Sequence, residues 1–351
     1  MMTTPAIRAL KMADQNRQIT LMTSTAGAAI ASLVTEIDQT IVYDAPWLKA
    51  TMLRENSAPE FAMIEQLRHA EFDAAVIFTV YSQNPLPSAF LCYMAGIPLR
   101  LAHCHENPYQ LLTHWVKDPE PTELIRHEVQ RQLDLVASIG CTLEDDRMQL
   151  QISQAAIEKV QQLLLTAGVN LNRPWVVIHP GATAASRRYP PEQFAIVART
   201  LVEQLGLQIV LTGTQSEQDL VTSIQSLMRA PAISLVNQLS LSELSALLSL
   251  TPLLIANNTG PVHIAAAVDT PVIDLYALTN PQHTPWRIAH RLLYHDVPCR
   301  FCYKSICPEE HHHCLRLVEP DTVVQAAIEL LSSDVNLAVD NLALYPSLKL
   351  C

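Results

Sequence analysis

Three kinds of residue are scarce in this sequence: glycine, aromatic residues and charged residues. The 351 residues include 8 glycines, and aromatic and charged residues make up 5% and 16% of the chain. No apolar run reaches the roughly 18 residues that a membrane span needs, and the opening MMTTPAIRALKMADQN lacks the apolar core of a signal peptide. We find no solenoid repeat and no low-complexity tract. These absences argue against a membrane-spanning, secreted or repeat protein.

The charge balance is acidic, with 23 Lys and Arg against 34 Asp and Glu and a net charge of -11. This balance argues against a nucleic acid or an anionic membrane as the main partner, although a cationic pocket can lie within an acidic protein. The chain is 49% hydrophobic, which is enough for a large core. Eight cysteines in so long a chain, without a signal peptide, predict reduced thiols and a cytoplasmic protein.

The second half of the chain alternates short apolar strands with amphipathic helices. A chain of this length suits two α/β domains. The helix predicted over 191–205 carries an apolar stripe, and Gly206 is placed to end it in the left-handed conformation. The alternation predicts a parallel, doubly wound sheet, with strands over Trp175–His179, Gln208–Thr212, Ala232–Val236, Leu253–Ala256 and Pro271–Tyr276.

The first half repeats the alternation less regularly. The favoured domain boundary is AGVNLNRP, because Gly, two Asn and Pro directly precede the strongest strand. We therefore predict an N-terminal domain over 1–168, a C-terminal domain over 169–335 and a tail over 336–351. Within the first domain the pattern predicts strands over Ile19–Met22, Thr40–Tyr43 and Ala74–Phe78 and helices near 59–70, 86–95 and 123–138.

The chain opens directly on a predicted helix, with Thr3 or Thr4 as its N-cap and Pro5 in its first turn. In a parallel α/β layer a helix normally follows a strand, and the turn between them lies at the carboxyl end of the strand, where ligands bind. We therefore expect the first strand of the N-terminal domain and its turn to be missing.

Two strand-to-helix turns have a composition that suits a phosphate-bearing ligand, and we interpret them as a nucleotide-sugar site. They are HPGATAASRRYP over His179–Pro190 and NNTGPVHIAAA over Asn257–Ala267. Neither contains a carboxylate, and together they gather hydroxyls, backbone donors and cations. Thr259 and Gly260 open a helix with Pro261 near its first position, so that free N–H groups face the edge of the sheet. The alternative is a capped helix without a ligand.

Each candidate ligand contact near these turns has a structural alternative. Arg187 and Arg188 could be a surface pair, and His179 and His263 could be histidines that only pack or bond to backbone. Glu217 could accept from ribose hydroxyls or be a solvated glutamate at a helix start. The candidate contacts are Thr183, Ser186, Arg187, Arg188, Gly213, Glu217, Asn258, Thr259, Gly260 and His263.

A cysteine-rich segment near the end of the chain contains enough soft ligands for a tetrahedral zinc site. Its spacing is not that of a paired CxxC finger, so reduced thiols that pack a loop are the alternative, and any zinc would be structural. The candidate ligands are Cys299, Cys302, Cys307 and Cys314, with His311, His312 and His313 alongside.

Three further groups have weaker functional interpretations. Glu144–Asp146 could bind a divalent cation, but a solvated turn is the favoured interpretation. For His103–His105 we favour ordinary loop packing over metal binding. Arg100 is a candidate contact for a phosphorylated acceptor.

The motifs together resemble glycosyltransferase family 9, the heptosyltransferase family of lipopolysaccharide synthesis. The resemblance rests on HPGA followed by SRRYP, a strand ending in T-G, and NNTGPVHIAAA, and it extends to TTPAIRALK, YDAPW at Tyr43–Trp47 and CRFCYKSICPEEHHHCL. It implies a GT-B architecture, with two Rossmann-like domains facing across a cleft, the donor on the C-terminal one and the acceptor on the N-terminal one. In the family pattern Arg187 occupies a basic position, and Asn258 stands where aspartate is common.

The resemblance also implies an activity: inverting transfer of a sugar from a nucleotide-sugar donor, ADP-heptose or similar, to a glycan or lipid-linked acceptor. It implies no required cofactor and a peripheral contact with the inner membrane. Fixed cations such as Arg187 and Arg188 would stabilise the leaving diphosphate. The family's general base is an aspartate in a Gly-Asp turn that has no counterpart here. A homologue that only binds the nucleotide sugar, or an epimerase or hydrolase on the same architecture, therefore stays open.

Overall fold

The structure is a computed structural model, and it describes residues 1–48, 51 and 53–332. Its contacts divide the chain into two compact units, which we call the N-terminal unit, residues 2–146, and the C-terminal unit, from Arg147 onward. The tail predicted over 336–351 lies outside the described residues.

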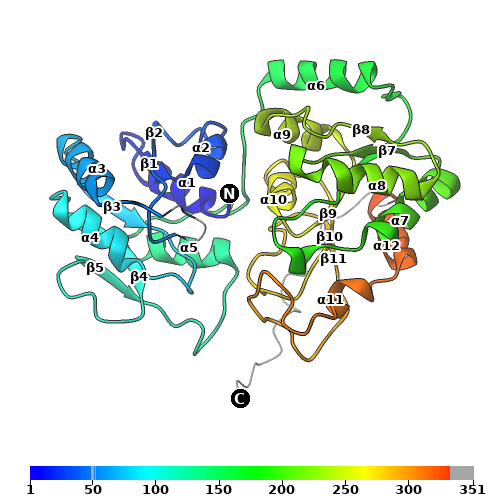
Figure 1. Cartoon of the computed structure of the whole chain (residues 1–351). Helices are drawn as coiled ribbons and strands as arrows, with labels where there is room; N and C mark the ends of the chain where they lie inside the picture. The colour runs from blue at the N-terminus through cyan, green and yellow to red at the C-terminus, as the bar shows by residue number, and fades with distance from the viewer. Residues whose placement is uncertain (49–50, 52, 333–351) are drawn as a thin grey trace. The chain divides into compact units, whose positions relative to one another are not determined.

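The C-terminal unit is built on a six-stranded parallel sheet of order β11-β10-β9-β6-β7-β8 (Figure 1). The predicted doubly wound sheet and all five of its predicted strands are confirmed, and a sixth strand, β11, was not predicted. The strands are β6 (Trp175–His179), β7 (Gln208–Leu211), β8 (Ile233–Ser234), β9 (Leu254–Asn257), β10 (Val272–Leu275) and β11 (His290–Leu293).

Helices cover this sheet and bury its apolar side chains. Helix α7 packs against α8 and α12, while α9 packs against α6 and α10. The longer helices are α6 (Gln154–Thr166), α7 (Pro191–Leu205), α8 (Gln218–Met228), α9 (Leu241–Leu250), α10 (Gly260–Ala267) and α12 (Pro320–Ser332). Short helical turns lie at η1 (Ala185–Arg187), η2 (Gln215–Glu217) and α11 (His313–Arg316).

Helix α7 shows how the sequence pattern produces a packed element. Phe194 and Leu201 of its apolar stripe are fully buried in the core of this unit, and Val202 and Leu205 pack against that core. Burial of each such side chain contributes roughly 1.5–3 kcal/mol. Gly206 ends the helix with φ 64°, the left-handed conformation that was predicted.

The N-terminal unit has five short strands and five helices within the described residues. All three predicted strands are confirmed to within a residue or two, and the helix predicted from 123 begins at Glu128. The elements are α1 (Thr4–Ala13), β1 (Thr20–Thr23), α2 (Thr25–Ala31), β2 (Gln39–Val42), α3 (Ala58–His69), β3 (Ala74–Ile77), α4 (Leu86–Met94), β4 (Leu99–Cys104), β5 (His114–Lys117) and α5 (Glu128–Ala137).

The strands of this unit form two separate parallel sheets, β1-β2 and β3-β4-β5. Met22 of β1 and Ala75 of β3 nevertheless pack against the same apolar cluster. Among the described residues, β1 and β3 each pair with one neighbour only. One edge of each strand is therefore left without a partner strand, and the expectation that a strand is missing stays a prediction.

The division between the units lies before α6, whereas the sequence placed a boundary at 168/169, after it. Three apolar residues of α6, Ala156, Val160 and Leu164, are buried, and the helix packs against α9 of the C-terminal unit. The Gly-Asn-Pro signal that suggested the boundary marks the turn from α6 to β6 instead.

Candidate functional site

The two motif-bearing turns of the C-terminal unit meet at one edge of its sheet. Strands β6 and β9 are parallel neighbours, so the segments that follow them start side by side. Asn257 joins the two segments, because its Nδ2 donates to the Pro180 carbonyl at 2.7 Å and its Oδ1 accepts from Tyr189 N at 3.0 Å. The two turns that the sequence singled out therefore form a single site at a carboxyl edge, the usual ligand position in such sheets.

Arg187 is the arginine of this site whose guanidinium is not used by the protein. It ends the short turn η1 and is partly buried. Within the described residues its guanidinium makes no ion pair or hydrogen bond, although its charge acts on the nearby Asp274 and His283. A partly buried guanidinium whose N–H groups have no partner among the described residues suits the oxygens of a phosphate.

Two other candidates on the same turn hold the turn in place instead. Arg188 donates from Nε to the Ala182 carbonyl at 2.8 Å. Ser186 donates from Oγ to the Lys304 carbonyl at 2.7 Å, which joins the turn to the cysteine-rich segment. Thr183 is exposed. The structure thus separates the neighbouring arginines, one free for a ligand and the other bound to backbone.

The amino end of α10 contributes backbone donors to the site. Thr259 is the N-cap in an extended conformation, but its Oγ1 bonds to the Asn257 carbonyl at 3.2 Å, and in the described structure it makes no side-chain cap. Gly260 is exposed, and Pro261 follows within the first turn. This helix end has the positive potential that favours an anion. His263 lies buried one turn further along α10.

Asp274 and His283 belong to this site, and our sequence analysis missed both. Asn258 Nδ2 donates to Asp274 Oδ2 at 2.7 Å and to the His283 carbonyl at 2.8 Å. Burial raises the pKa of Asp274 to about 8, although the Asn258 hydrogen bond and the Arg187 charge oppose this rise. Burial, together with Arg187, lowers the pKa of His283 to about 4. The missed signal was a charged residue inside the apolar run PVIDLYA.

His179 and Glu217 lie at the ends of β6 and β7. His179 is buried, which lowers its pKa, and its Nδ1 lies 3.0 Å from Thr212 Oγ1. Glu217 is partly buried, and its Oε2 accepts from Thr214 N at 2.7 Å in a capping box. A Cβ added to Gly181 would clash with the Glu217 carboxylate. Gly181 and the neighbouring Gly213 therefore provide the room that this carboxylate occupies.

The cysteine-rich segment brings its thiols near one another. Cys299 Sγ lies 3.7 Å from His311 Nε2, and the rings of His311 and His313 stack at 4.2 Å. Burial raises the pKa of Cys314, and the three other thiols add to that rise. In the part of the chain that the structure describes, no group of three or more His, Cys, Asp or Glu is placed to hold a metal ion. The zinc interpretation stays a prediction.

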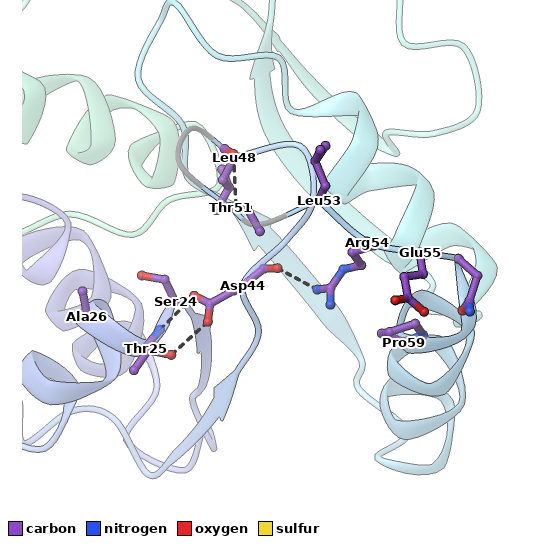
Figure 2. A pocket seen from close by; sticks show the side chains of 11 residues that line it. Ser24, Thr25, Ala26, Asp44, Leu48, Thr51, Leu53, Arg54, Glu55 and Pro59 are labelled. Carbon is purple, nitrogen blue, oxygen red and sulfur yellow. Dashed lines mark hydrogen bonds between the residues drawn. The ribbon is translucent and has the colours of Figure 1, made fainter. Parts of the chain in front are cut away.

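The N-terminal unit contains a pocket of about 810 Å³ near the carboxyl ends of β1 and β2, shown in Figure 2. Asp44 accepts from Thr25 N at 3.1 Å and from Thr25 Oγ1 at 2.9 Å. Arg54 donates to the Asp44 carbonyl at 2.7 Å and forms an ion pair with Glu60 at 2.7 Å. The lining combines polar and apolar groups and comprises Ser24, Thr25, Ala26, Asp44, Leu48, Thr51, Leu53, Arg54, Glu55, Asn56 and Pro59. No motif pointed to this pocket beyond the YDAPW sequence that contains Asp44.

Two weaker candidates of the N-terminal unit turn out to have packing roles. The Arg100 guanidinium donates to the carbonyls of Leu111 at 2.8 Å and Gln110 at 2.9 Å, so backbone groups already occupy it. His103 is buried with its Nε2 3.1 Å from the Arg131 carbonyl. Arg131 is itself buried and pairs with Asp118 at 2.5 Å. These contacts agree with the loop-packing interpretation of His103.

Over the described residues, no helix combines the length and the apolar character that crossing a membrane requires.

Comparisons with known proteins agree with this geometry. Residues 61–313 match the family model of glycosyltransferase family 9 (heptosyltransferase). Lipopolysaccharide heptosyltransferase 2 of Salmonella typhimurium (strain LT2) is 26% identical over 285 residues, which cover 76% of this chain and 78% of that protein.

Solved structures share the fold. A family 9 glycosyl transferase from Veillonella parvula DSM 2008 superposes with a TM-score of 0.79 at 20% identity, covering 94% of this chain and 93% of its own. ADP-heptose lipopolysaccharide heptosyltransferase II of E. coli gives a TM-score of 0.73 at 22% identity, with 94% of each chain covered. The GT-B class expected from the resemblance is confirmed. The family model matches most of the length of this chain, and the chain therefore belongs to glycosyltransferase family 9, the heptosyltransferase family.

Proposed function

We propose that this protein transfers a heptose or a similar sugar from a nucleotide-sugar donor to a lipopolysaccharide or other surface-glycan acceptor, with inversion at the anomeric carbon. Family membership supports the reaction class. The names of the relatives from Salmonella and E. coli support lipopolysaccharide as the acceptor class, and the E. coli protein is named for ADP-heptose. These relatives are transferases, which favours turnover over a homologue that only binds its donor.

The observation that carries the proposal is the joining of the turn that bears Arg187 to the turn that opens α10. The Asn257 side chain, in the second turn, bonds to Pro180 and Tyr189 of the first and so holds the two together. As the bond between the sugar and the diphosphate breaks, negative charge develops on the leaving phosphate. A fixed guanidinium and oriented N–H groups stabilise that charge without having to reorganise, which lowers the barrier.

We further propose that the acceptor binds in the pocket of the N-terminal unit that Ser24, Asp44 and Glu55 help to line. Hydroxyl and carboxylate groups such as those of Ser24, Asp44 and Glu55 are suited to the hydroxyls of a sugar. For the location of the protein we keep the expectation of a cytoplasmic enzyme that contacts the inner membrane peripherally. Fractionation of cells into soluble and membrane pools tests that location.

The test of the function is a transfer assay with the full chain. ADP-heptose and heptose-containing acceptors of the lipopolysaccharide core are incubated with the protein, released ADP is measured, and the anomeric configuration of the product is read by NMR. We expect ADP release that requires the acceptor. Release that is equally fast without acceptor would indicate a hydrolase or epimerase instead, and donor binding with no release would indicate a binding-only homologue.

A further inference from the structure

The amide of Asn258 is held in one orientation by two acceptors. Its Nδ2 donates to Asp274 Oδ2 at 2.7 Å and to the His283 carbonyl at 2.8 Å. An amide nitrogen has two hydrogens, so both are used. The remaining polar atom, Asn258 Oδ1, accepts no hydrogen bond from any described residue, and it can only accept.

Asp274 is the unusual member of this arrangement. It is 0% exposed, and its Oδ1 has no hydrogen-bond partner among the described residues. No described cation lies within ion-pair distance of it, although Arg187 exerts an attraction from farther away. A buried carboxylate without a paired cation costs far more free energy than the protonated acid does. Burial therefore favours the uncharged carboxylic acid at neutral pH.

We propose that uncharged Asp274 is a positioning residue that turns Asn258 Oδ1 toward the bound donor, where this oxygen accepts a hydrogen bond from a donor hydroxyl. The inference rests on the proposed function, because it requires a nucleotide sugar at this edge of the sheet. Asn258 directly precedes Thr259, the N-cap of α10, which places its amide beside the proposed diphosphate position.

The partner of Asn258 Oδ1 follows from its chemistry. A diphosphate presents only acceptors to its surroundings, so it cannot donate to this oxygen. The two groups that flank the diphosphate in a nucleotide sugar are the ribose and the transferred sugar, and both carry hydroxyls. An uncharged acceptor in this position also avoids placing a carboxylate charge beside the negative phosphates. The site thus combines a cation for the phosphates with a neutral acceptor for the adjoining hydroxyl.

The experiment measures the binding of ADP and of ADP-heptose to the full chain by calorimetry at pH 7, together with the KM for donor and for acceptor. The variants are Asn258→Ala, which removes the acceptor, Asp274→Ala, which releases the amide, and Asp274→Asn, which offers Asn258 a similar oxygen without charge. Asp321→Asn is the matched control, because it removes an exposed carboxylate in the first turn of α12. Circular dichroism and Tm report on folding.

We expect Asn258→Ala and Asp274→Ala to weaken donor binding about tenfold and to raise the KM for donor but not for acceptor. Asp274→Asn should recover most of that loss, and Asp321→Asn should bind as the wild type does. Loss with both ligands assigns the hydroxyl to the ribose, whereas loss with ADP-heptose alone assigns it to the transferred sugar.

Two results would overturn the inference, and they have different consequences for the proposed function. If the wild type binds donor and Asp274→Ala binds it equally well despite a lower Tm, Asp274 is only structural and the proposed function stands. If the wild type binds neither ADP nor ADP-heptose, the proposed function fails and this inference fails with it.

Discussion

At the scale of single residues, neighbours in sequence have different roles because their side chains find different partners. Arg188 bonds to the Ala182 carbonyl, whereas Arg187 is left for a ligand. The motif S-R-R-Y-P predicted a basic contact, but the letters alone do not distinguish the two arginines. The distinction depends on the path of the backbone between β6 and α7.

Replacement of Arg187 tests its role directly. We expect Arg187→Ala to weaken ADP binding by about 1.5–3 kcal/mol, roughly ten- to a hundredfold, because a charge-assisted hydrogen bond to phosphate is lost. Calorimetry with ADP is the measurement, and Arg173→Ala, at an exposed arginine of the same unit, is the control. Equal weakening in both variants would mean that general charge, and not this site, governs binding.

The buried carboxyl of Asp274 gives the protein a pH dependence of stability. Burial raises the pKa of this group from 3.8 to about 8, so the folded state holds its proton more tightly than the unfolded chain does. Its contribution to stability is complete below about pH 4 and is lost as the pH rises through about 8. Urea denaturation should therefore show that the free energy of unfolding of the wild type falls relative to Asp274→Asn between pH 4 and pH 8. Parallel pH profiles of the two proteins would contradict the assignment.

At the scale of elements, helices and strands with clear local sequence signals were predicted, and those without such signals were missed. Strand β6 and helix α7 have the predicted bounds. The strand is an apolar run followed by a proline, and the helix has an apolar stripe that ends at Gly206, so each signal acts within a few residues. Strand β8 is only two residues long, against five predicted. Strand β4 was missed, since Arg100 and His103 interrupt its apolar residues, whereas β6 is apolar up to its last residue.

The end of α8 offers a gain in stability. Arg229 caps this helix with φ 51°, a left-handed conformation that costs free energy in any residue except glycine. We expect Arg229→Gly to stabilise the protein by roughly 0.5–1 kcal/mol, seen as a higher urea midpoint. Arg229→Ala, which keeps a Cβ, should give no comparable gain. A lower midpoint for the glycine variant would show that the arginine side chain contributes more than the strain costs.

Whether the cysteine-rich segment binds zinc is a question for experiment. If it holds a structural zinc, elemental analysis of the purified protein should find about one zinc per chain, with four Cys or mixed Cys and His ligands. The paired variant Cys299→Ser with Cys302→Ser should lose that metal and lower Tm. A metal-free wild type with an unchanged Tm in chelator would favour reduced, loop-packing thiols instead.

At the scale of the whole molecule, the two units differ in how well their sheets are buried. Every residue of β6 and β9 is buried, whereas β1 has none that is fully buried and β2 is mostly exposed. The N-terminal unit also contains a buried ion-pair network around Arg131, which bonds to Asp118 and Glu120. A buried ion pair is weak evidence for stability, because desolvation of the charges offsets their attraction, so this network does not replace the missing burial.

This difference predicts unequal protection. Amide hydrogen exchange should be faster in β1 and β3 than in β6 and β9, because each of the former has one edge without a described partner strand. Mass spectrometry of deuterium uptake, resolved by peptide, is the measurement. Limited proteolysis should likewise cut the N-terminal unit first. Equal protection in the two units would contradict the expectation that the strands of the N-terminal unit are the less protected ones.

The sequence by itself determined the alternation of strands and helices, the helix end at Gly206 and the two ligand-type turns. These features depend on residues only a few positions apart, so propensity and turn chemistry suffice to predict them. Only the tertiary structure decided which of the two arginines bonds to the backbone, that α6 packs with the C-terminal unit, and that Asp274 holds Asn258. Those outcomes depend on contacts between segments far apart in the chain, where burial sets the charge of a carboxyl and the direction of an amide.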